Sequence, residues 1–292
     1  MIRSTEQAPT IAFQGQPGAY SDLACRHVFP AMTTLPCDAF EDAFAAVREG
    51  RAALAMIPIE NSVAGRVADI HHLMPDSGLY IIGEHFERVN HHLLGLPGAK
   101  LDAIRTVRSH VHALGQCRNF IRAHGLTPVV AADTAGSAAE IKERGDPAVA
   151  AIASELAGQI YGLVSLAENI EDAEHNTTRF MIMSREPHWP PPGGLTVTTF
   201  VFNVKNVPAA LYKALGGFAT NGVNMTKLES YMVGGNFTAT QFYADVEAHP
   251  DDRPLKLALE ELAFFSTEVK ILGVYPAHQL RIAARQEERG EV

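Results

Sequence analysis

A short segment rich in proline and glycine constrains the fold of this chain more than any other feature. Residues 186–194 read EPHWPPPGG, with three consecutive prolines followed by two glycines. Proline lacks the N–H group that a helix interior or a central strand needs, so neither element continues through this segment. We therefore predict a linker that separates a long N-terminal region from a C-terminal unit of domain size.

Composition narrows the class of protein. The 292 residues suffice for two or three compact units. The net charge of -9 and the scattered lysines and arginines argue against a nucleic-acid partner, which needs a concentrated basic surface. No apolar segment has the length of a membrane span or a signal peptide. The three cysteines, Cys25, Cys37 and Cys117, form no CxxC pair, so we expect reduced thiols in a cytoplasmic protein.

The C-terminal unit alternates between strand and helix patterns. Runs of β-branched and aromatic residues predict strands, and leucines at helical spacing predict two helices. The expected order is strand 196–204, a helix from Pro208 to Asn221-Gly222, strand 223–232, a turn at 234–236, strand 237–247, a helix capped by Asp251 or Asp252, and strand 268–274. This β-α-β-β-α-β order predicts a ferredoxin-like fold, which by itself identifies no function.

The N-terminal region predicts an α/β fold with largely parallel sheets, because short apolar runs alternate with helical patterns. The runs are 11–15, 53–57 ending at Pro58, 79–82, 104–107, 128–132, 148–153 and 180–183. Asp38 is expected to cap the helix that starts near Phe40. We place polar residues at the carboxyl ends of strands, where open α/β sheets bind ligands, at 60–62, 109–110, 133–136 and 177–179.

Each polar motif has two interpretations when taken alone. The loop 15–21 offers N–H groups to an anion, but a tight turn is the favoured interpretation. Residues 60–62 either bind a substrate or cap the next helix, and Ser109 is either a site residue or an N-cap. Thr178 and Arg179 should point to opposite faces of a strand unless the backbone bends.

The histidine pairs do not predict a metal site. His71-His72 and His91-His92 are adjacent in the chain, and no Cys/His spacing supports them as ligands. We expect structural histidines there. The chain also lacks a serine–histidine–acid motif and a P-loop, so the residues alone indicate a cleft enzyme or a binding protein without an evident cofactor.

Taken in order, the motifs resemble those of prephenate dehydratase. They are GQPGAYS at 15–21, PIENS at 58–62, Ser109-His110 with Gln116-Cys117, TAG at 134–136 and NTTRF at 176–180. The segment NGVNMTKLES at 221–230 resembles the ACT domain that follows that catalytic domain. The resemblance covers nearly the whole chain. It implies an α/β chain with a bilobed, periplasmic-binding-protein-like catalytic domain at 9–186 and a ferredoxin-like βαββαβ ACT regulatory domain at 195–278.

The same resemblance implies roles for individual residues. Thr178 falls on the catalytic threonine, and Arg179 on the arginine expected to meet a substrate carboxylate. The implied catalytic residues are Thr178, Asn61, Ser109 and Gln116, and the substrate-binding residues are Tyr20, Ser21, Ser62, Thr134, Arg179 and Phe180. The implied effector-binding residues are Ala209, Ala210, Leu211, Asn224, Met225, Glu229 and Ser230.

The implied reaction converts prephenate to phenylpyruvate, water and CO2 in phenylalanine biosynthesis, with no metal or organic cofactor. Phenylalanine is the implied allosteric effector, and a homodimer or homotetramer the implied assembly. The family's Pro-Gly-Ala-Leu motif reads PAAL at 208–211 here, so Ala209 places a Cβ where glycine allows close approach. Two further family motifs also differ here. The family's Ser-His-Pro-Gln reads SHVH at 109–112, and its Glu-Ser-Arg-Pro reads ESYM at 229–232.

Two alternatives stay open. Arogenate dehydratase uses a substrate with an amino group in place of the keto oxygen, and no residue separates the two enzymes. A non-catalytic aromatic-ligand sensor would use the same cleft, but it would not need Thr178, Asn61 and Arg179 together.

Overall fold

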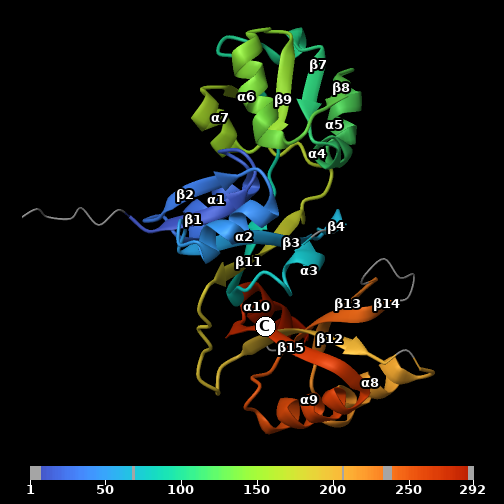
Figure 1. Cartoon of the computed structure of the whole chain (residues 1–292). Coiled ribbons are helices and arrows are strands. Elements are labelled where there is room, and N and C mark those ends of the chain that lie inside the picture. The colour runs from blue at the N-terminus through green and yellow to red at the C-terminus, as the bar shows by residue number, and fades with distance from the viewer. Residues whose placement is uncertain (1–7, 68–69, 206, 233–238, 289–292) are drawn as a thin grey trace, which may run out of the picture. The chain divides into compact units, whose positions relative to one another are not determined.

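The computed structural model describes residues 8–67, 70–205, 207–232 and 239–288 (Figure 1). They form two compact units. The first contains the chain up to Val67 together with His85–Phe180, and the second contains Ala68–Glu84 together with the chain from Met181 onward. The predicted linker at 186–194 has neither helix nor strand. Residues 70–84 therefore belong with the C-terminal unit, although they come long before the linker.

The first sheet of the first unit is built from the N-terminal strands. β1 (Thr10–Gln14) runs parallel to both β2 (Thr33–Cys37) and β3 (Leu54–Asn61), and β3 also pairs with β4 (Gly65–Arg66). Helices α1 (Tyr20–Val28) and α2 (Phe40–Arg48) connect these strands. The apolar residues of β1 and β3 are almost fully buried, which is typical of strands covered on both faces.

Two local predictions for this sheet were wrong. β3 does not end at Pro58 but continues to Asn61, because its pairing with β1 stops at Met56 and Pro58 needs no N–H for that neighbour. The residue that caps α2 is Ala39 rather than Asp38, and the Ala39 N–H donates to the Asp42 carboxylate at 3.3 Å.

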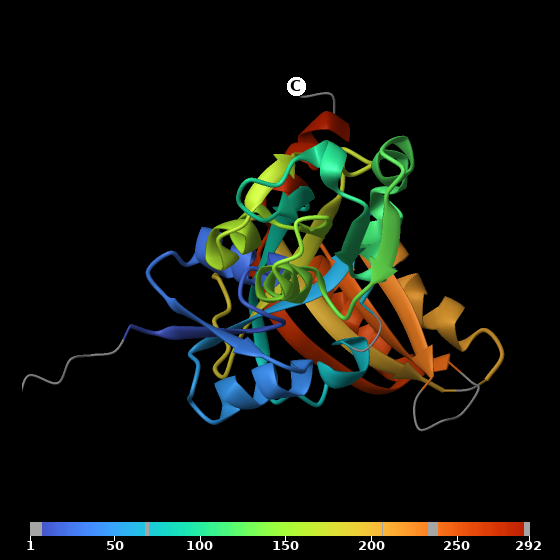
Figure 2. The ribbon, with the colours of Figure 1, turned by 90° about the horizontal axis from the view of Figure 1, so that it is seen from above.

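The second sheet of the first unit has the order β10-β6-β9-β7-β8, and the chain that forms it takes the green part of the colour scale in Figures 1 and 2. Its strands are β6 (His92–Gly95), β7 (Thr106–Ser109), β8 (Thr127–Val130), β9 (Val149–Ala153) and β10 (Val164–Ala167). β7 is parallel to β8 and β9 as predicted, but β6 is antiparallel to β9 and β10.

Helices pack on both faces of this second sheet. They are α4 (Val111–Gln116), α5 (Arg118–Ala123), α6 (Thr134–Arg144) and α7 (Glu155–Tyr161), with a short 3-10 turn, η1 (Leu101–Ala103). Leu93 packs into the cluster with α4 and α5, whereas its neighbour Leu94 packs into the cluster with α6 and α7. Strand neighbours point to opposite faces, so one β6 strand stabilises two layers.

The second unit has the predicted βαββαβ order. It runs β12 (Thr196–Val204), α8 (Ala210–Thr220), β13 (Met225–Met232), β14 (Ala239–Val246), α9 (Arg253–Phe265) and β15 (Ser266–Pro276), with the sheet order β13-β14-β12-β15. Both helices bury their apolar sides in one cluster with Phe200, Phe202 and Phe242. The predicted turn at 234–236 lies outside the described residues, as does the start of the strand predicted at 237–247. A further helix, α10 (Gln279–Glu288), follows β15.

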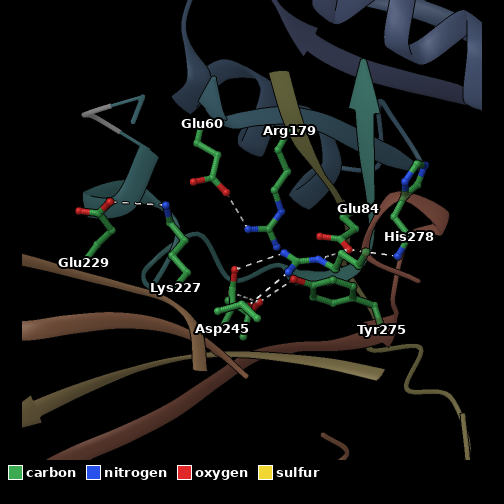
Figure 3. A network of polar contacts seen from close by, with 11 residues as sticks. Glu60, Glu84, Arg179, Lys227, Glu229, Asp245, Tyr275 and His278 are labelled. Carbon is green, nitrogen blue, oxygen red and sulfur yellow. Dashed lines mark hydrogen bonds and ion pairs between the residues drawn. The ribbon is translucent and has the colours of Figure 1, made fainter. Parts of the chain in front are cut away.

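Polar contacts hold residues 70–84 in the second unit (Figure 3). This segment contains α3 (Ile70–Leu73) and the start of β5 (Tyr80–Arg88), where Ile81 pairs with Gly273 of β15. The Arg281 guanidinium of α10 donates to the buried Glu84 carboxylate at 2.7 Å, and the His278 N–H donates to the same oxygen at 3.1 Å. Hydrogen bonds to a charged group are among the stronger ones, so this contact holds α10 and β5 together.

Candidate functional site

The candidate site forms where the end of β3 lies beside the beginning of β11 (Thr177–Ser184). The Ser62 N–H donates to the Thr177 carbonyl at 2.8 Å, and the Thr177 N–H donates to Ser62 Oγ at 3.0 Å. Ser62 Oγ donates in turn to the His175 carbonyl at 2.8 Å. Residues 177–179 thus open a strand and do not follow its carboxyl end as predicted, yet they still meet the end of β3.

The Asn61 side-chain amide has one orientation. Its Oδ1 accepts hydrogen bonds from the backbone N–H groups of Val63 at 2.9 Å and Ala64 at 2.8 Å. Its Nδ2 must therefore donate, and it reaches Thr178 Oγ1 at 3.0 Å and Asn176 Oδ1 at 2.8 Å. Since Thr178 Oγ1 accepts from Asn61, the hydroxyl proton of Thr178 remains available for another acceptor.

The hydrogen bonds continue from Asn176 in a fixed direction. With its Oδ1 accepting from Asn61, Asn176 donates through Nδ2 to Gln116 Oε1 at 3.0 Å. The same Gln116 oxygen lies 2.9 Å from His91 Nε2, which must carry a proton because the oxygen only accepts. His91 Nδ1 lies 2.9 Å from the Tyr20 hydroxyl, which is also 2.6 Å from the Asn90 carbonyl. We call Thr178, Asn61, Asn176, Gln116, His91 and Tyr20 the polar relay.

Burial keeps the far end of the polar relay neutral. It lowers the pKa of His91 below the usual value, against the opposing effects of the Gln116 hydrogen bond and the Glu171 carboxylate. Burial also raises the pKa of Tyr20 well above the usual value, and nearby Cys117 and Glu171 add to the effect. A neutral His91 with its proton on Nε2 leaves Nδ1 as an acceptor, so the Tyr20 hydroxyl shares its one proton between His91 Nδ1 and the Asn90 carbonyl.

The lowered pKa of His91 predicts a pH-dependent stability. The unfolded chain takes up a proton on His91 near its ordinary pKa of about 6.5, whereas the folded protein does so only at lower pH. The free energy of unfolding should therefore fall as the pH drops from about 7 to about 5, and His91→Gln should make that dependence less steep. Urea denaturation at a series of pH values measures this slope, with exposed His124→Gln as the control. Equal slopes in wild type and His91→Gln would contradict the prediction.

Arg179 and Thr178 have different partners, as expected for strand neighbours. The Arg179 guanidinium is almost fully buried and donates to Glu60 Oε1 at 2.9 Å (Figure 3). Thr178 instead accepts from Asn61. The guanidinium carbon also lies 5.9 Å from the centre of the Phe86 ring. The Arg179–Glu60 ion pair therefore joins β11 to β3 on one side, and the Thr178–Asn61 hydrogen bond joins them on the other.

Ser109 lies in the interior rather than at a helix cap. Its side chain is fully buried, and its Oγ donates to the Ile152 carbonyl of β9 at 2.6 Å. The N-cap of α4 is His110, whose Nδ1 accepts from the His112 N–H at 3.3 Å. The suggestion that Ser109 caps this helix is therefore wrong, and its hydroxyl proton is used within the second sheet.

The loop at 15–21 is a tight turn that packs against α7. Gly18 has a φ of +88°, and a Cβ added there would lie 2.7 Å from the Cα of Ala157. The Gly18 N–H donates to the Asp22 carboxylate at 2.8 Å, and its carbonyl accepts from Ser154 Oγ at 2.6 Å. Both backbone groups of Gly18 are thus satisfied inside the protein, which favours the turn over an anion cradle.

The remaining predicted residues occupy separate places. Ser21 and Phe180 are buried, and Thr134 is the first residue of α6, after the N-cap Asp133. In the second unit, Ala209 has a positive φ of 62° just before α8, which starts with Ala210 and Leu211. Asn224 donates to Glu247 at 3.1 Å, and Met225, Glu229 and Ser230 lie on β13.

Sequence reasoning missed two members of the polar relay. Asn176 was part of the quoted NTTRF motif but received no role, and His91 was taken for a structural histidine. Of the other histidines, His71 packs against Tyr231 and Tyr243, and His92 bonds to Ser165. Among the described residues, no cluster of three or more histidine, cysteine or acidic side chains is arranged to hold a metal ion. Within the same residues, no helix combines the length and apolar character needed to cross a bilayer.

The comparisons agree on one family. Residues 11–188 match the family model described as prephenate dehydratase. The chain is 58% identical over 272 residues to the bifunctional N-acyl-homoserine lactone acylase/prephenate dehydratase of Komagataeibacter europaeus, covering 93% of this chain and 97% of that protein. It is 40% identical over 285 residues to arogenate dehydratase/prephenate dehydratase 1, chloroplastic, of Arabidopsis thaliana. That alignment covers 93% of this chain and 73% of the Arabidopsis protein.

A solved structure shows the same fold. Prephenate dehydratase from Arthrobacter aurescens in complex with L-Phe superposes with a TM-score of 0.84 at 34% sequence identity, covering 92% of this chain and 90% of that one. The likeness confirms the predicted fold class, a bilobed α/β region followed by a βαββαβ unit.

Proposed function

The chain belongs to the prephenate dehydratase family and converts prephenate to phenylpyruvate, and we propose that the polar relay carries out this reaction with Thr178 as the hydrogen-bond donor to the leaving oxygen. The observation that carries the proposal is the orientation of Asn61. Two backbone N–H groups hold its Oδ1, so its Nδ2 donates to Thr178 Oγ1 and leaves the threonine proton available to another acceptor.

The chemistry needs such a donor. As the bond to CO2 breaks, its electrons enter the ring, and the electrons of the C–O bond leave with the hydroxyl oxygen, which takes up a proton to become water. Negative charge develops on that oxygen only in the transition state, so a donor aimed at it lowers the barrier selectively. Donation from Asn61 polarises the Thr178 hydroxyl and strengthens it as a donor.

The other members act by position in this proposal. Asn176 accepts from the same Asn61 nitrogen and donates to Gln116, whose oxygen also accepts from His91, and His91 contacts Tyr20. These hydrogen bonds hold Asn61 in place. Roles for Ser109 in catalysis, and for Ser21, Ser62, Thr134, Arg179 and Phe180 in substrate binding, stay predictions.

Parallel assays with prephenate and arogenate test the substrate. We expect purified protein to form phenylpyruvate from prephenate. The name of the Arabidopsis relative includes both substrates, so the rate of phenylalanine formation from arogenate decides which substrate this enzyme prefers. If folded protein turned over neither substrate, the result would favour a non-catalytic ligand sensor over an enzyme.

We propose that phenylalanine regulates the enzyme through an ACT domain at 195–278, which follows a catalytic domain at 9–186. The support is the L-Phe complex of the Arthrobacter relative. A homodimer or homotetramer and a cytoplasmic location belong to the same proposal, and the free, buried Cys25, Cys37 and Cys117 suit a reducing compartment. Calorimetric titration with phenylalanine tests the regulation, and the absence of binding would contradict it.

Ala209 retains a backbone conformation that favours glycine. Its φ of 62° and ψ of 14° lie in the left-handed region, where a Cβ costs about 1–2 kcal/mol. Its exposed side chain makes few contacts, so Ala209→Gly should raise the free energy of unfolding by about 0.5–1 kcal/mol after the entropy that glycine loses on folding. Urea denaturation measures the change. The matched control is Ala263→Gly at an exposed position of α9, where glycine should destabilise by about 1 kcal/mol. A loss of stability in both variants would contradict the prediction.

We also propose a second activity, hydrolysis of the amide bond of N-acyl-homoserine lactones. The support is the bifunctional relative, whose sequence aligns with this chain over 97% of its own length. Purified protein should release homoserine lactone from N-octanoyl-homoserine lactone, which an amine-reactive label followed by mass spectrometry detects.

A further inference from the structure

A pocket of about 390 Å³ lies in the first unit beside the far end of the polar relay. Its lining comes from α1, from the end of β5 and the chain that leads into β6, and from α7 with its N-cap. Tyr20 forms part of the wall, but Thr178, Asn61, Asn176 and Gln116 do not. The volume is in the range of pockets that bind small molecules. The dehydratase chemistry proposed above leaves this pocket unused.

A histidine and a buried carboxylate form a pair in this pocket. His27 Nδ1 lies 2.8 Å from Glu87 Oε2, and His85 Nε2 lies 3.0 Å from the same oxygen. Burial by itself would raise the pKa of Glu87, but hydrogen bonds from His85 and His27 hold the pKa below its usual value. Glu87 is therefore an ionised acceptor, and His27 presents a proton to it on Nδ1.

This pairing gives His27 the form of a general base. With the proton on Nδ1, the lone pair lies on Nε2, and the carboxylate stabilises the imidazolium that forms when Nε2 takes up a proton. The His27 side chain is 55% exposed and lines the pocket, whereas the Glu87 side chain is 9% exposed. Water in the pocket can thus reach the imidazole more readily than the carboxylate, which also contributes to the lining.

The rest of the lining combines apolar and polar side chains, as an amide with an acyl chain requires. Leu23 and Leu156 supply apolar wall. Arg88 is exposed and has no ion-pair partner among the described residues, while the other arginine of the wall, Arg26, is held by Asp22 at 2.9 Å. A free guanidinium near a general base is the group that stabilises the negative oxygen formed when water adds to a carbonyl.

We propose that this pocket is a second catalytic site, in which His27 activates water to hydrolyse the amide bond of a small N-acyl amine. The inference rests on the second activity proposed above and assigns it a place. His27 Nε2 removes a proton from water as the oxygen bonds to the amide carbon, and Arg88 faces the resulting oxyanion. When the C–N bond breaks, the nitrogen takes the proton from His27 and leaves as the amine, and the acyl group leaves as the carboxylic acid.

The test measures two reactions in the same full-length preparations, amine release from N-octanoyl-homoserine lactone and phenylpyruvate formation from prephenate. We expect His27→Gln to lower kcat for amine release by about 10²–10⁴-fold, the usual contribution of a general base, with prephenate turnover unchanged. Glu87→Gln should lower the same rate and shift its pH profile, because the imidazolium loses its carboxylate. Thr178→Ala should have the opposite pattern, and His124→Gln, at the exposed C-cap of α5, should change neither reaction.

Three outcomes would overturn the assignment. Amine release by wild type that persists in His27→Gln would remove the pocket but leave the second activity standing. Loss of amine release in Thr178→Ala would move both reactions to the polar relay. No amine release by wild type that turns over prephenate would reject the second activity and the pocket together. Unchanged prephenate turnover in His27→Gln serves as the check that this variant is folded.

Discussion

Thr178→Ala lowers kcat for prephenate by about 10²–10³-fold and leaves the fold intact, if the polar relay acts as proposed, because this is the usual loss when one transition-state donor is removed. The hydroxyl makes a single described side-chain hydrogen bond, from Asn61, and it lies at the start of β11, so its removal disturbs little packing. Steady-state kinetics measures the change, and KM should stay close to the wild-type value because the donor acts on charge that appears only in the transition state.

A neighbouring threonine provides the matched control. Thr177→Ala removes the same atoms one residue earlier in β11, where the strand contact to Ser62 uses only the Thr177 backbone. Thr177→Ala should therefore retain most activity, and Thr178→Ser, which keeps a hydroxyl, should lose less than Thr178→Ala. Similar rates for the Thr177 and Thr178 alanine variants would show that Thr178 has no special role.

Gly18→Ala should have the largest effect on stability, a loss of about 2–5 kcal/mol in the free energy of unfolding. The positive φ of 88° costs a side chain about 1–2 kcal/mol, and overpacking adds about 1–3 kcal/mol. The new Cβ would lie 2.7 Å from the Ala157 Cα, which is backbone and cannot turn aside. Urea denaturation followed by circular dichroism measures the loss.

Gly98 separates the two causes. Its φ of +87° nearly equals that of Gly18, but an added Cβ would meet nothing within 4 Å. Gly98→Ala should therefore show the backbone strain alone, about 1–2 kcal/mol. If both variants lost the same free energy, the close approach of Gly18 to α7 would have no energetic consequence.

Local sequence patterns were sufficient for the order of elements in the C-terminal unit. β12 has the predicted bounds, and the prediction that Asn221-Gly222 ends the helix is confirmed, since α8 ends at Thr220 and Gly222 has a positive φ of 66°. These features depend on residues only a few positions apart. Backbone preference and burial of one apolar face therefore determine them wherever the unit packs.

Ordered motifs also singled out four residues that hydrogen bonds join in the polar relay, Thr178, Asn61, Gln116 and Tyr20, while their roles in the reaction stay predictions. The motifs could not tell which way each hydrogen bond runs. That direction follows from the backbone N–H groups of Val63 and Ala64, which donate to Asn61 Oδ1, and a sequence motif does not encode these contacts. Ser109 has the right identity for a site residue, yet its hydroxyl is used by the second sheet.

Only the tertiary structure decided which distant residues meet. Asn61 and Thr178 are 117 positions apart, His27 and Glu87 are 60 apart, and Glu84 and Arg281 are 197 apart. A histidine beside a histidine looks the same in the sequence whether it packs against tyrosines, as His71 does, or completes a relay, as His91 does. The sequence by itself determined the elements and the types of side chain available for chemistry. Their pairing depends on how strands and helices pack, because a hydrogen bond forms only between groups that folding brings within about 3 Å of each other.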